Sequence, residues 1–455
     1  MLAVGALLLL ALAQMPTADM AAPATDMIEG RPAPSETSPI QLRIDSATAG
    51  STLEIGPGTY HGDLVIDRPL RLIGRGRPRL VGSGRGSVVR IRAADVLVEG
   101  FDIDGLGGGD LGRDASGIHV AAVRATIRDC RIVNTLFGIY LREANDATVE
   151  RSTIHGIPGK DPGEKGSGIH VWDTIGFRLV GNEMAEVRDG FYIQASSHGF
   201  IAHNTARDLR YGLHYMFSDD NVFEDNTFAN GAAGTALMYS KHITFRRNRF
   251  LHNRGFASVG LLLKACDDVL AEDNLIEDNA RGIFLEGSYR NRFRRNIVAE
   301  SDAAIVLYDS SAENIFEGNS FVGNMTPLSL SGRRTDTRFD GNYWSGNDEP
   351  DLDGDGRSDR PYRLSSVFDH LRSNLTAADL MTPGFAAAAL GFAERTFPVL
   401  EPITVVDRAP LVSPPSLPDV PRANAVPRRA SARGLAVSFA GIALSLVTLV
   451  RRGRR

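Results

Sequence analysis

The sequence lacks a marked excess of charge of either sign, and it is almost without cysteine. Its 455 residues carry 50 basic and 55 acidic side chains, and the resulting net charge of −5 is spread along the chain. Nucleic-acid-binding proteins show a basic patch or stripe, so we exclude nucleic acid as a partner. The 2 cysteines, Cys130 and Cys266, lie six units apart in the repeat described next. That is roughly 29 Å at the strand spacing, which a disulfide cannot bridge.

A repeat of about 22 residues dominates the segment from Gly168 to Trp344. One phrase in it is a small residue followed by an apolar run, as in 168–171, 190–193 and 236–239. The other phrase places an asparagine between apolar residues at steps of 22, 22, 26, 22, 23 and 23, at Asn204, Asn226, Asn248, Asn274, Asn296, Asn319 and Asn342. A period of this size is typical of solenoids, in which each unit buries its apolar face against its neighbours.

The pieces within each repeat are short, alternate apolar and polar residues, and are separated by Gly, Asn and Asp, which indicates strands and turns. The recurring asparagine suits a stacked ladder in which each amide bonds the next at the strand spacing of about 4.8 Å. We therefore predict an all-β fold, a right-handed parallel β-helix over residues 41–348. We expect about eleven turns. Phe101, Cys130 and Ser152 stand at the asparagine position in the early turns.

The N-terminal residues indicate export. Residues 1–13 contain an apolar run that ends in Ala11-Leu12-Ala13, which is typical of a signal peptide, although the basic segment that usually precedes the run is missing. Residues 14–40 are rich in Ala, Pro and Thr, and we expect a disordered tail. This tail contains Met15, Met20 and Met27, whose soft thioethers suit Cu(I). The alternative is that a disordered tail merely contains three methionines.

The C-terminal residues do not repeat. We expect residues 376–433 to form a docking helix and a proline-rich linker. Residues 434–450 carry no charge and are followed by four arginines, so we predict a membrane helix with the β-helix outside and the C-terminus in the cytoplasm. The alternative is a helix that lies on a membrane or a partner. The fold is thus a β-helix with a C-terminal extension that ends in a membrane helix.

An outward row of side chains is the candidate functional site. If Ile169 and Val171 point into the core, the residues between and after them point out. The equivalent outward places of successive turns are His119, Tyr140, His170, Tyr192, His214 and Met238, with Arg142, Trp172, Gln194, Met216 and Ser240 beside them. Imidazole and thioether together suit copper, so we predict a copper site formed by His214, Met216 and Met238, with His170 two turns away. A sugar-binding face and an ordinary surface are the alternatives.

An acidic loop follows the last asparagine phrase, and we interpret residues 349–375 as a cap of the solenoid. Its aspartates stand at positions one, three, five and nine of a calcium loop, at Asp351, Asp353, Asp355 and Asp359. Position twelve is Tyr362 rather than glutamate, which excludes a complete EF-hand. We therefore predict either a calcium ion in this loop or an acidic turn whose carboxylates accept backbone N–H groups.

Three stretches together resemble the NosD family: the opening 57–60 with 69–74, the Gly-Ile coils, and the closing Gly-Asn-Tyr-Trp-Ser with the Asp-rich loop and Asp359-Arg360-Pro361-Tyr362. The resemblance covers roughly residues 41–363, and the closing block is its most specific part. NosD proteins are periplasmic β-helical maturation proteins for nitrous oxide reductase. The resemblance implies a role in assembling the copper sites of that reductase, with an ABC transporter permease and ATPase and a copper chaperone lipoprotein as partners.

Two other functions compete with the role that the resemblance implies. Exported β-helices often act on acidic sugars, and such enzymes need carboxylates clustered on one face with a basic residue. The adjacent pairs Asp219-Asp220 and Asp267-Asp268 follow strands at turns, with no basic residue recurring beside them in a strand column. A passive surface or adhesion protein would need no row of metal ligands. The sequence therefore favours a periplasmic copper-binding protein without catalysis.

Overall fold

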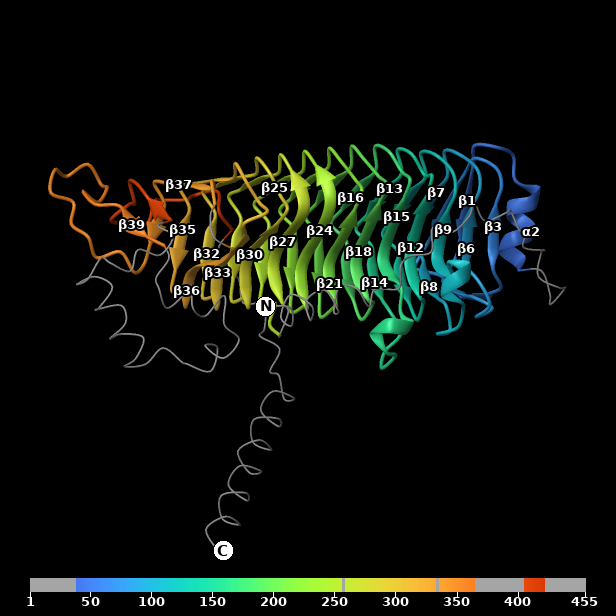
Figure 1. Cartoon of the computed structure of the whole chain (residues 1–455). Helices are drawn as coiled ribbons and strands as arrows, with labels where there is room; N and C mark the ends of the chain where they lie inside the picture. Colours follow the sequence, from blue (N-terminus) through green and yellow to red (C-terminus); the bar gives the residue numbers. More distant parts are fainter. Residues whose placement is uncertain (1–37, 256–257, 333–334, 365–404, 422–455) are drawn as a thin grey trace, which may run out of the picture. The chain divides into compact units, whose positions relative to one another are not determined.

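The repeat folds into coils of three short strands, and each strand pairs in parallel with its counterpart in the next coil (Figure 1). The computed structural model describes residues 38–255, 258–332, 335–364 and 405–421. The predicted signal peptide, almost all of the tail with its three methionines, and the segment 434–450 lie outside the described residues. Within the described ranges, no helix is both long enough and apolar enough to cross a membrane.

Sheet A contains the first strand of each coil, and its parallel run is β1 (Ser51–Ile55), β4 (Leu70–Gly74), β7 (Leu97–Glu99), β10 (Thr126–Arg128), β13 (Thr148–Glu150), β16 (Arg178–Val180), β19 (Phe200–Ala202), β22 (Val222–Glu224), β25 (Thr244–Arg246), β28 (Leu270–Glu272), β31 (Arg292–Arg294), β34 (Ile315–Glu317) and β37 (Arg338–Asp340). The sheet ends with β40 (Val406–Asp407) and β39 (Tyr362–Arg363), which pair antiparallel with each other.

Sheet B contains the second strand of each coil, in the order β2 (Thr59–His61), β5 (Arg79–Val81), β8 (Asp102–Asp104), β11 (Arg131–Val133), β14 (Thr153–His155), β17 (Glu183–Ala185), β20 (Thr205–Arg207), β23 (Thr227–Ala229), β26 (Arg249–Leu251), β29 (Leu275–Glu277), β32 (Ile297–Ala299), β35 (Ser320–Val322) and β38 (Tyr343–Trp344).

Sheet C contains the third strand of each coil, in the order β3 (Leu64–Ile66), β6 (Val89–Ile91), β9 (Ser116–Val120), β12 (Phe137–Arg142), β15 (Ser167–Trp172), β18 (Asp189–Gln194), β21 (Tyr211–Met216), β24 (Ala233–Lys241), β27 (Val259–Asp267), β30 (Arg281–Glu286), β33 (Ala303–Tyr308) and β36 (Thr326–Ser331). Two loops that lead into this sheet contain the 3₁₀ turns Leu111–Arg113 and Pro162–Glu164.

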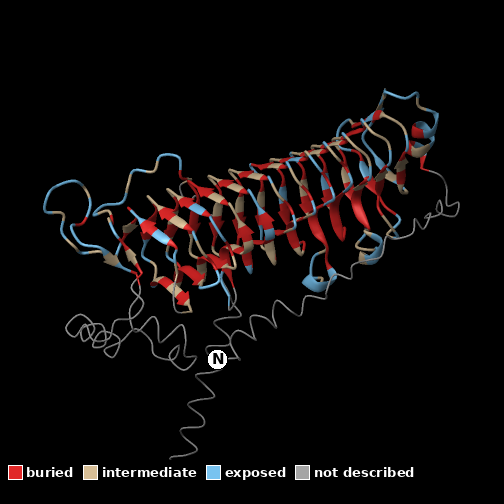
Figure 2. Cartoon of the chain, turned by 45° about the horizontal axis from the view of Figure 1, so that its top comes forward, coloured by how far each residue is buried: buried red, intermediate tan, exposed pale blue. Residues whose placement is uncertain are grey.

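The predicted parallel β-helix is confirmed, with a 13-stranded sheet B where about eleven turns were expected. Crossovers between parallel strands are right-handed in nearly all proteins, which agrees with the predicted hand of the coil. Aliphatic and aromatic side chains fill its interior. Figure 2 marks the buried residues in red, and they recur in the strands along the described solenoid. The additional turns come from the early repeats, whose three-residue strands carry no asparagine to mark them.

The asparagine ladder lies inside the coil, as predicted. Asn226 is wholly buried, and its backbone N–H and its side-chain Nδ2 both donate to Oδ1 of Asn248, at 3.0 and 2.9 Å. Its Nδ2 also donates to the carbonyl oxygen of Ile201 at 2.8 Å, so the amide has no unpaired hydrogen. The same pattern joins the neighbouring turns through Asn204 and Asn274. The ladder therefore fixes the register between turns.

Both ends of the solenoid are covered in ways that the repeat did not predict. Residues 41–46 were expected to begin the first coil, but they belong to helix α2 (Pro39–Ser46). This helix buries Ile40 and Ile44 on the core, and the side chain of Gln41 bonds both backbone groups of Val65 in β3. An unpaired sheet edge invites aggregation, so these contacts protect the first coil.

At the other end, part of the predicted proline-rich linker packs on the solenoid as β40. Asp407 is wholly buried, and its carboxylate accepts hydrogen bonds from the backbone N–H of Gly341, from the N–H and Nδ2 of Asn342 and from Nε1 of Trp344. Of these donors, the N–H and Nδ2 of Asn342 are the groups that the asparagine of a further turn would otherwise satisfy. The linker prediction is therefore wrong for residues 405–407, because the last turn needs an acceptor.

We predict that Asn226→Leu lowers the free energy of unfolding by about 1–3 kcal/mol, since it leaves buried partners of the ladder unpaired. Chemical denaturation followed by circular dichroism measures the change. Thr227→Leu, at a half-buried place on the same turn, is the control and should cost less. If the Asn226 variant and the parent have the same free energy of unfolding, the hydrogen bonds of the ladder do not stabilise the fold as proposed.

Candidate functional site

The outward side chains of sheet C form rows that run from turn to turn. Ile169 and Val171 in β15 are wholly buried in the core, so His170 and Trp172 face outward, as the sequence predicted. The strand pairing places Tyr140 and Tyr192 on either side of His170. The row of aromatic side chains predicted from the sequence therefore exists, and it lies on one face of the solenoid.

Five rings stack in this row. The ring centroids are 5.3, 4.3 and 4.5 Å apart at successive steps, and the last pair meets edge to face at 4.8 Å, in the order His119, Tyr140, His170, Tyr192 and His214. Because the ring of Tyr192 lies between His170 and His214, the two imidazoles do not contact each other. Any ion that they share must therefore displace this ring.

The structure shifts the predicted place of Met238 by two residues. Met238 pairs with Met216, while Ala236 is the residue opposite His214. The reason lies in the glycines that occupy equivalent places in successive strands of sheet C, where a Cβ atom would meet the backbone of the next turn. Gly234, rather than Ala236, is the member of this column in β24. A Cβ atom on Gly234 would lie 2.5 Å from the carbonyl oxygen of Gly260. A shift of two keeps Met238 on the outer face and brings the two methionines onto adjacent strands.

Asp189 is a site residue that the sequence analysis missed. It is wholly buried on the same face, where Nε and Nη2 of Arg210 donate to its two carboxylate oxygens at 2.9 and 2.6 Å. Nε of Arg188 lies 3.4 Å from Asp189 Oδ2, and Nδ1 of His214 lies 3.5 Å from it. Burial opposes ionisation, but His214 and Arg210 outweigh it and hold the pKa of this carboxyl well below its usual value.

His170 and His214 retain unused donor atoms. They are 7% and 5% exposed, and within the described part of the chain neither ring nitrogen of His170 nor Nε2 of His214 has a hydrogen-bond partner, while Nδ1 of His214 faces Asp189. Burial, helped by the nearby Arg188 guanidinium, lowers the pKa of His170 to about 3. His170 is therefore neutral at neutral pH. Buried polar atoms without partners are costly, and a neutral imidazole nitrogen is the commonest metal ligand in proteins, so these nitrogens are candidate ligands.

The donor set around His214 is compact. Met216 follows it by two residues, about 6.6 Å along the strand, and Met238 lies one strand further at about 4.8 Å from Met216. Met238 is 5% exposed and Met216 is half-buried. One imidazole and two thioethers thus lie on one face, and these are ligand types that suit copper.

The acidic loop brings three of its four predicted ligands together. One carboxylate oxygen from each of Asp351, Asp353 and Asp355 lies within 4.8 Å of the others. Asp351 also accepts the N–H groups of Gly354 and Gly356, at 2.7 and 2.9 Å. The carboxylate of Asp359 instead accepts the backbone N–H of Leu352. The loop thus forms the acidic turn that was one alternative, and it also gathers three of the oxygens that the other alternative, a calcium ion, would need.

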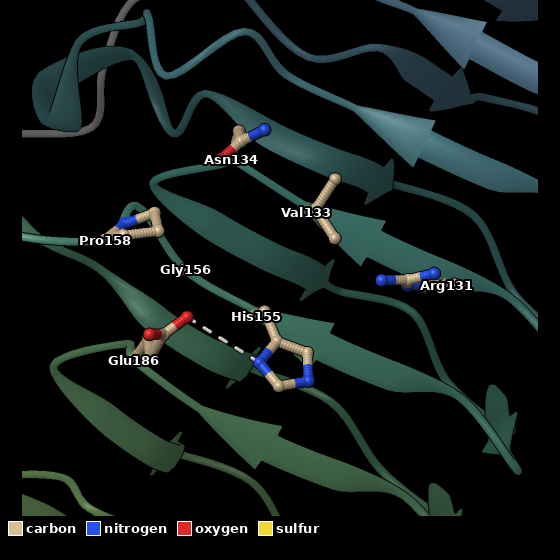
Figure 3. Close-up of a pocket in the computed structure, with 7 residues that line it drawn as sticks. All are labelled: Arg131, Val133, Asn134, His155, Gly156, Pro158 and Glu186. Carbon is tan, nitrogen blue, oxygen red and sulfur yellow. Dashed lines mark ion pairs between the residues drawn. The ribbon is translucent and has the colours of Figure 1, made fainter.

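A pocket of ≈ 370 Å³ opens on the outer side of sheet B, beside the loop that contains Pro158 (Figure 3). Nδ1 of His155 lies 3.7 Å from Oε2 of Glu186 in it, and Arg131 lines its far side. None of the predicted metal ligands lines this pocket, so it is separate from the outer face of sheet C.

The three stacked sheets and the outward rows define the chain as a parallel β-helix protein. Residues 155–349 match the profile of a family described as "Periplasmic copper-binding protein (NosD)". This match confirms the resemblance to the NosD family seen in the sequence.

Two curated relatives extend this finding beyond the profile. Over 379 residues, the chain is 29% identical to the "Probable ABC transporter binding protein NosD" of Stutzerimonas stutzeri, an alignment that covers 79% of this chain and 86% of the relative. A protein of the same name from Pseudomonas aeruginosa is 29% identical over 80% of this chain and 88% of its own length. Both relatives are named as binding proteins rather than as enzymes.

Solved structures show the fold alone. The A-module of the mannuronan C-5 epimerase AlgE6 from Azotobacter vinelandii superimposes with a TM-score of 0.56 at 16% identity. The match covers 66% of this chain and 94% of the module.

Proposed function

We propose that this protein is a periplasmic copper-binding maturation factor that helps to assemble the copper sites of nitrous oxide reductase. The observation that carries the proposal is the set of His214, Met216 and Met238 on one face of a chain from a family described as copper-binding. Copper is the cargo of the protein, which binds it and releases it without catalysing a reaction. Action on an acidic polysaccharide is the alternative, and unsaturated products from such a substrate would favour it.

The proposed partners follow from the relatives. Because they are named as ABC transporter binding proteins, we infer that this chain works with the permease and the ATPase of an ABC transporter. A copper chaperone lipoprotein would supply the ion, and nitrous oxide reductase would receive it.

The proposed copper site is formed by His214, Met216 and Met238, and His170 completes it if the ring of Tyr192 moves aside. Two thioethers and one imidazole form a soft donor set that favours Cu(I) over Zn(II). A transfer site must release its ion, and a set of neutral ligands provides no charge to hold it. The contact of His214 with Asp189 at 3.5 Å orients the imidazole, in the way that outer carboxylates orient metal-binding histidines.

Replacing His214 by Ala and both Met216 and Met238 by Leu should weaken Cu(I) binding by at least about 10-fold. Leucine keeps the volume of methionine, so we expect the melting temperature to change little for the methionine replacements. Competition with a Cu(I) chelator measures the affinity. The Met216→Leu, Met238→Leu double variant separates loss of ligands from any destabilisation by His214→Ala.

If the triple variant binds Cu(I) with the same affinity as the parent, the proposed site is wrong. The tail methionines Met15, Met20 and Met27 would then be the next candidates. A truncation that begins after Met27 tests them directly and leaves every described residue of the solenoid in place.

We further propose that Asp351, Asp353 and Asp355 bind a calcium ion, with Asp359 as a fourth ligand after its bond to Leu352 breaks. Three carboxylate oxygens within 4.8 Å of one another support the proposal, since calcium takes several such ligands. Calcium should raise the melting temperature of the parent because it binds only the folded loop. Asp353→Asn with Asp355→Asn should abolish the increase, while magnesium should produce little of it. An equal response of parent and variant to calcium would contradict the proposal.

We also propose that residues 434–450 attach the protein to the membrane. The uncharged run and the arginines after it support this, and a membrane transporter as partner agrees with it. The full-length protein should fractionate with membranes, whereas a chain truncated at Pro427 should be recovered in the soluble periplasmic fraction. Recovery of the full-length protein wholly in the soluble fraction would contradict the attachment.

A further inference from the structure

A second set of metal-ligating side chains lies at the corner between sheet C and sheet A. Phe200, Val222 and Thr244 begin successive strands of sheet A and pair with one another. The residues two positions before them therefore occupy equivalent places on consecutive turns. They are His198, Asp220 and His242, and all three have left-handed backbone conformations, with φ of 55, 57 and 57°.

At two other places in this corner column, an aspartate is paired with an arginine of the adjacent turn. Arg124 donates to both oxygens of Asp95 at 2.7 and 2.8 Å, and Arg290 donates to both oxygens of Asp268 at 3.0 Å. Such pairs satisfy the carboxylate and leave no place for an ion. Asp220 differs, because the equivalent places on both sides of it are occupied by histidines.

The three side chains are open to solvent. Nδ1 of His242 lies 3.4 Å from Oδ1 of Asp220, and the two side chains are 53% and 46% exposed. His198 is also exposed, and it forms no ion pair or hydrogen bond with the described residues. Exposed side chains can change rotamer at little cost, so both imidazoles can turn toward the carboxylate between them.

We propose that His198, Asp220 and His242 form a binding site for a divalent transition-metal ion. Adjacent turns are about 4.8 Å apart, so the two histidines flank the aspartate across about 9.6 Å. Two imidazole nitrogens and one carboxylate oxygen suit Zn(II) and Cu(II), and Cu(II) binds most tightly to such sets. Water fills the remaining positions of the exposed ion.

This site is independent of the Cu(I) site. The His214, Met216 and Met238 set consists of a buried imidazole and thioethers, whereas the corner set has a carboxylate, no sulfur and high exposure. The corner site does not require the proposed maturation role. A preference for the divalent ion therefore distinguishes it by chemistry as well as by place.

His203 supplies the matched control. It is exposed and has φ of 55°, like the proposed ligands, but it lies at the corner between sheet A and sheet B. Asp225, at the equivalent place of the next turn, is already bound by both Nε and Nη2 of Arg247 at 3.0 and 2.9 Å. A histidine beside a satisfied aspartate should contribute nothing to binding.

Isothermal titration of the full-length protein with ZnCl₂ tests the proposal. The His198→Ala, His242→Ala double variant should bind one ion fewer than the parent, and Asp220→Asn should weaken that ion by at least about 10-fold. His203→Ala should leave the titration unchanged. With CuCl₂, the electron paramagnetic resonance spectrum of the parent should show coupling to nitrogen, and this signal should weaken in the double variant.

The variant His214→Ala, Met216→Leu, Met238→Leu should retain this zinc ion, which separates failure of this site from failure of the Cu(I) site. Replacement of exposed side chains should leave the melting temperature close to that of the parent. A double variant that binds as many zinc ions as the parent with the same affinity would overturn the proposal. An equal loss in His203→Ala would also overturn it.

Discussion

The hydrogen bond from one buried asparagine to the next is the interaction on which the register of this solenoid depends. Each Oδ1 receives both the backbone N–H and the Nδ2 of the asparagine one turn earlier, as Asn248 does for Asn226. A slip of one residue would break both bonds and bring polar side chains into the core, since strand faces alternate. A buried amide without partners costs more than its bonds contribute, so the ladder selects one register rather than adding much net stability.

A fixed register places equivalent residues of every turn in one column, and function on this fold is therefore built across turns. The ring row of sheet C and the corner set His198, Asp220 and His242 both follow the solenoid axis at the strand spacing. The His214 and Met216 pair uses the other direction, along one strand. A column of ion pairs can therefore become a proposed set of metal ligands when one residue type changes. In the corner column, Arg290 pairs with Asp268, whereas histidines take the places beside Asp220.

The periodic features of the protein could be predicted from the sequence, and the unrepeated ones could not. The asparagine phrase gave the fold, the ladder and the outward place of His170, because each follows from a local pattern that recurs. The prediction placed Met238 beside His214, since it used Ala236 where Gly234 stands in the column. Asp189 was missed because strict alternation of inward and outward side chains, counted back from the inward Phe191, would place Asp189 inside. Gly190 lies between the two residues and breaks this alternation. Helix α2 and strand β40 each occur once and lie outside the repeat, so the repeat pattern could not predict them.

The direction of the ladder explains why its two ends are closed by different residues. Toward the N-terminus, Asn182 accepts the N–H of Ser152, and the hydroxyl of Ser152 accepts the N–H of Cys130. Toward the N-terminus, the asparagine position is thus taken by side chains with fewer polar atoms. At Phe101 it is taken by a buried apolar side chain that needs no hydrogen-bond partner. Toward the C-terminus the ladder ends in two donors, the N–H and Nδ2 of Asn342, and a neutral amide would add donors of its own. The carboxylate of Asp407 accepts from Asn342, Gly341 and Trp344 and donates nothing, so a residue far along the chain must return to this place.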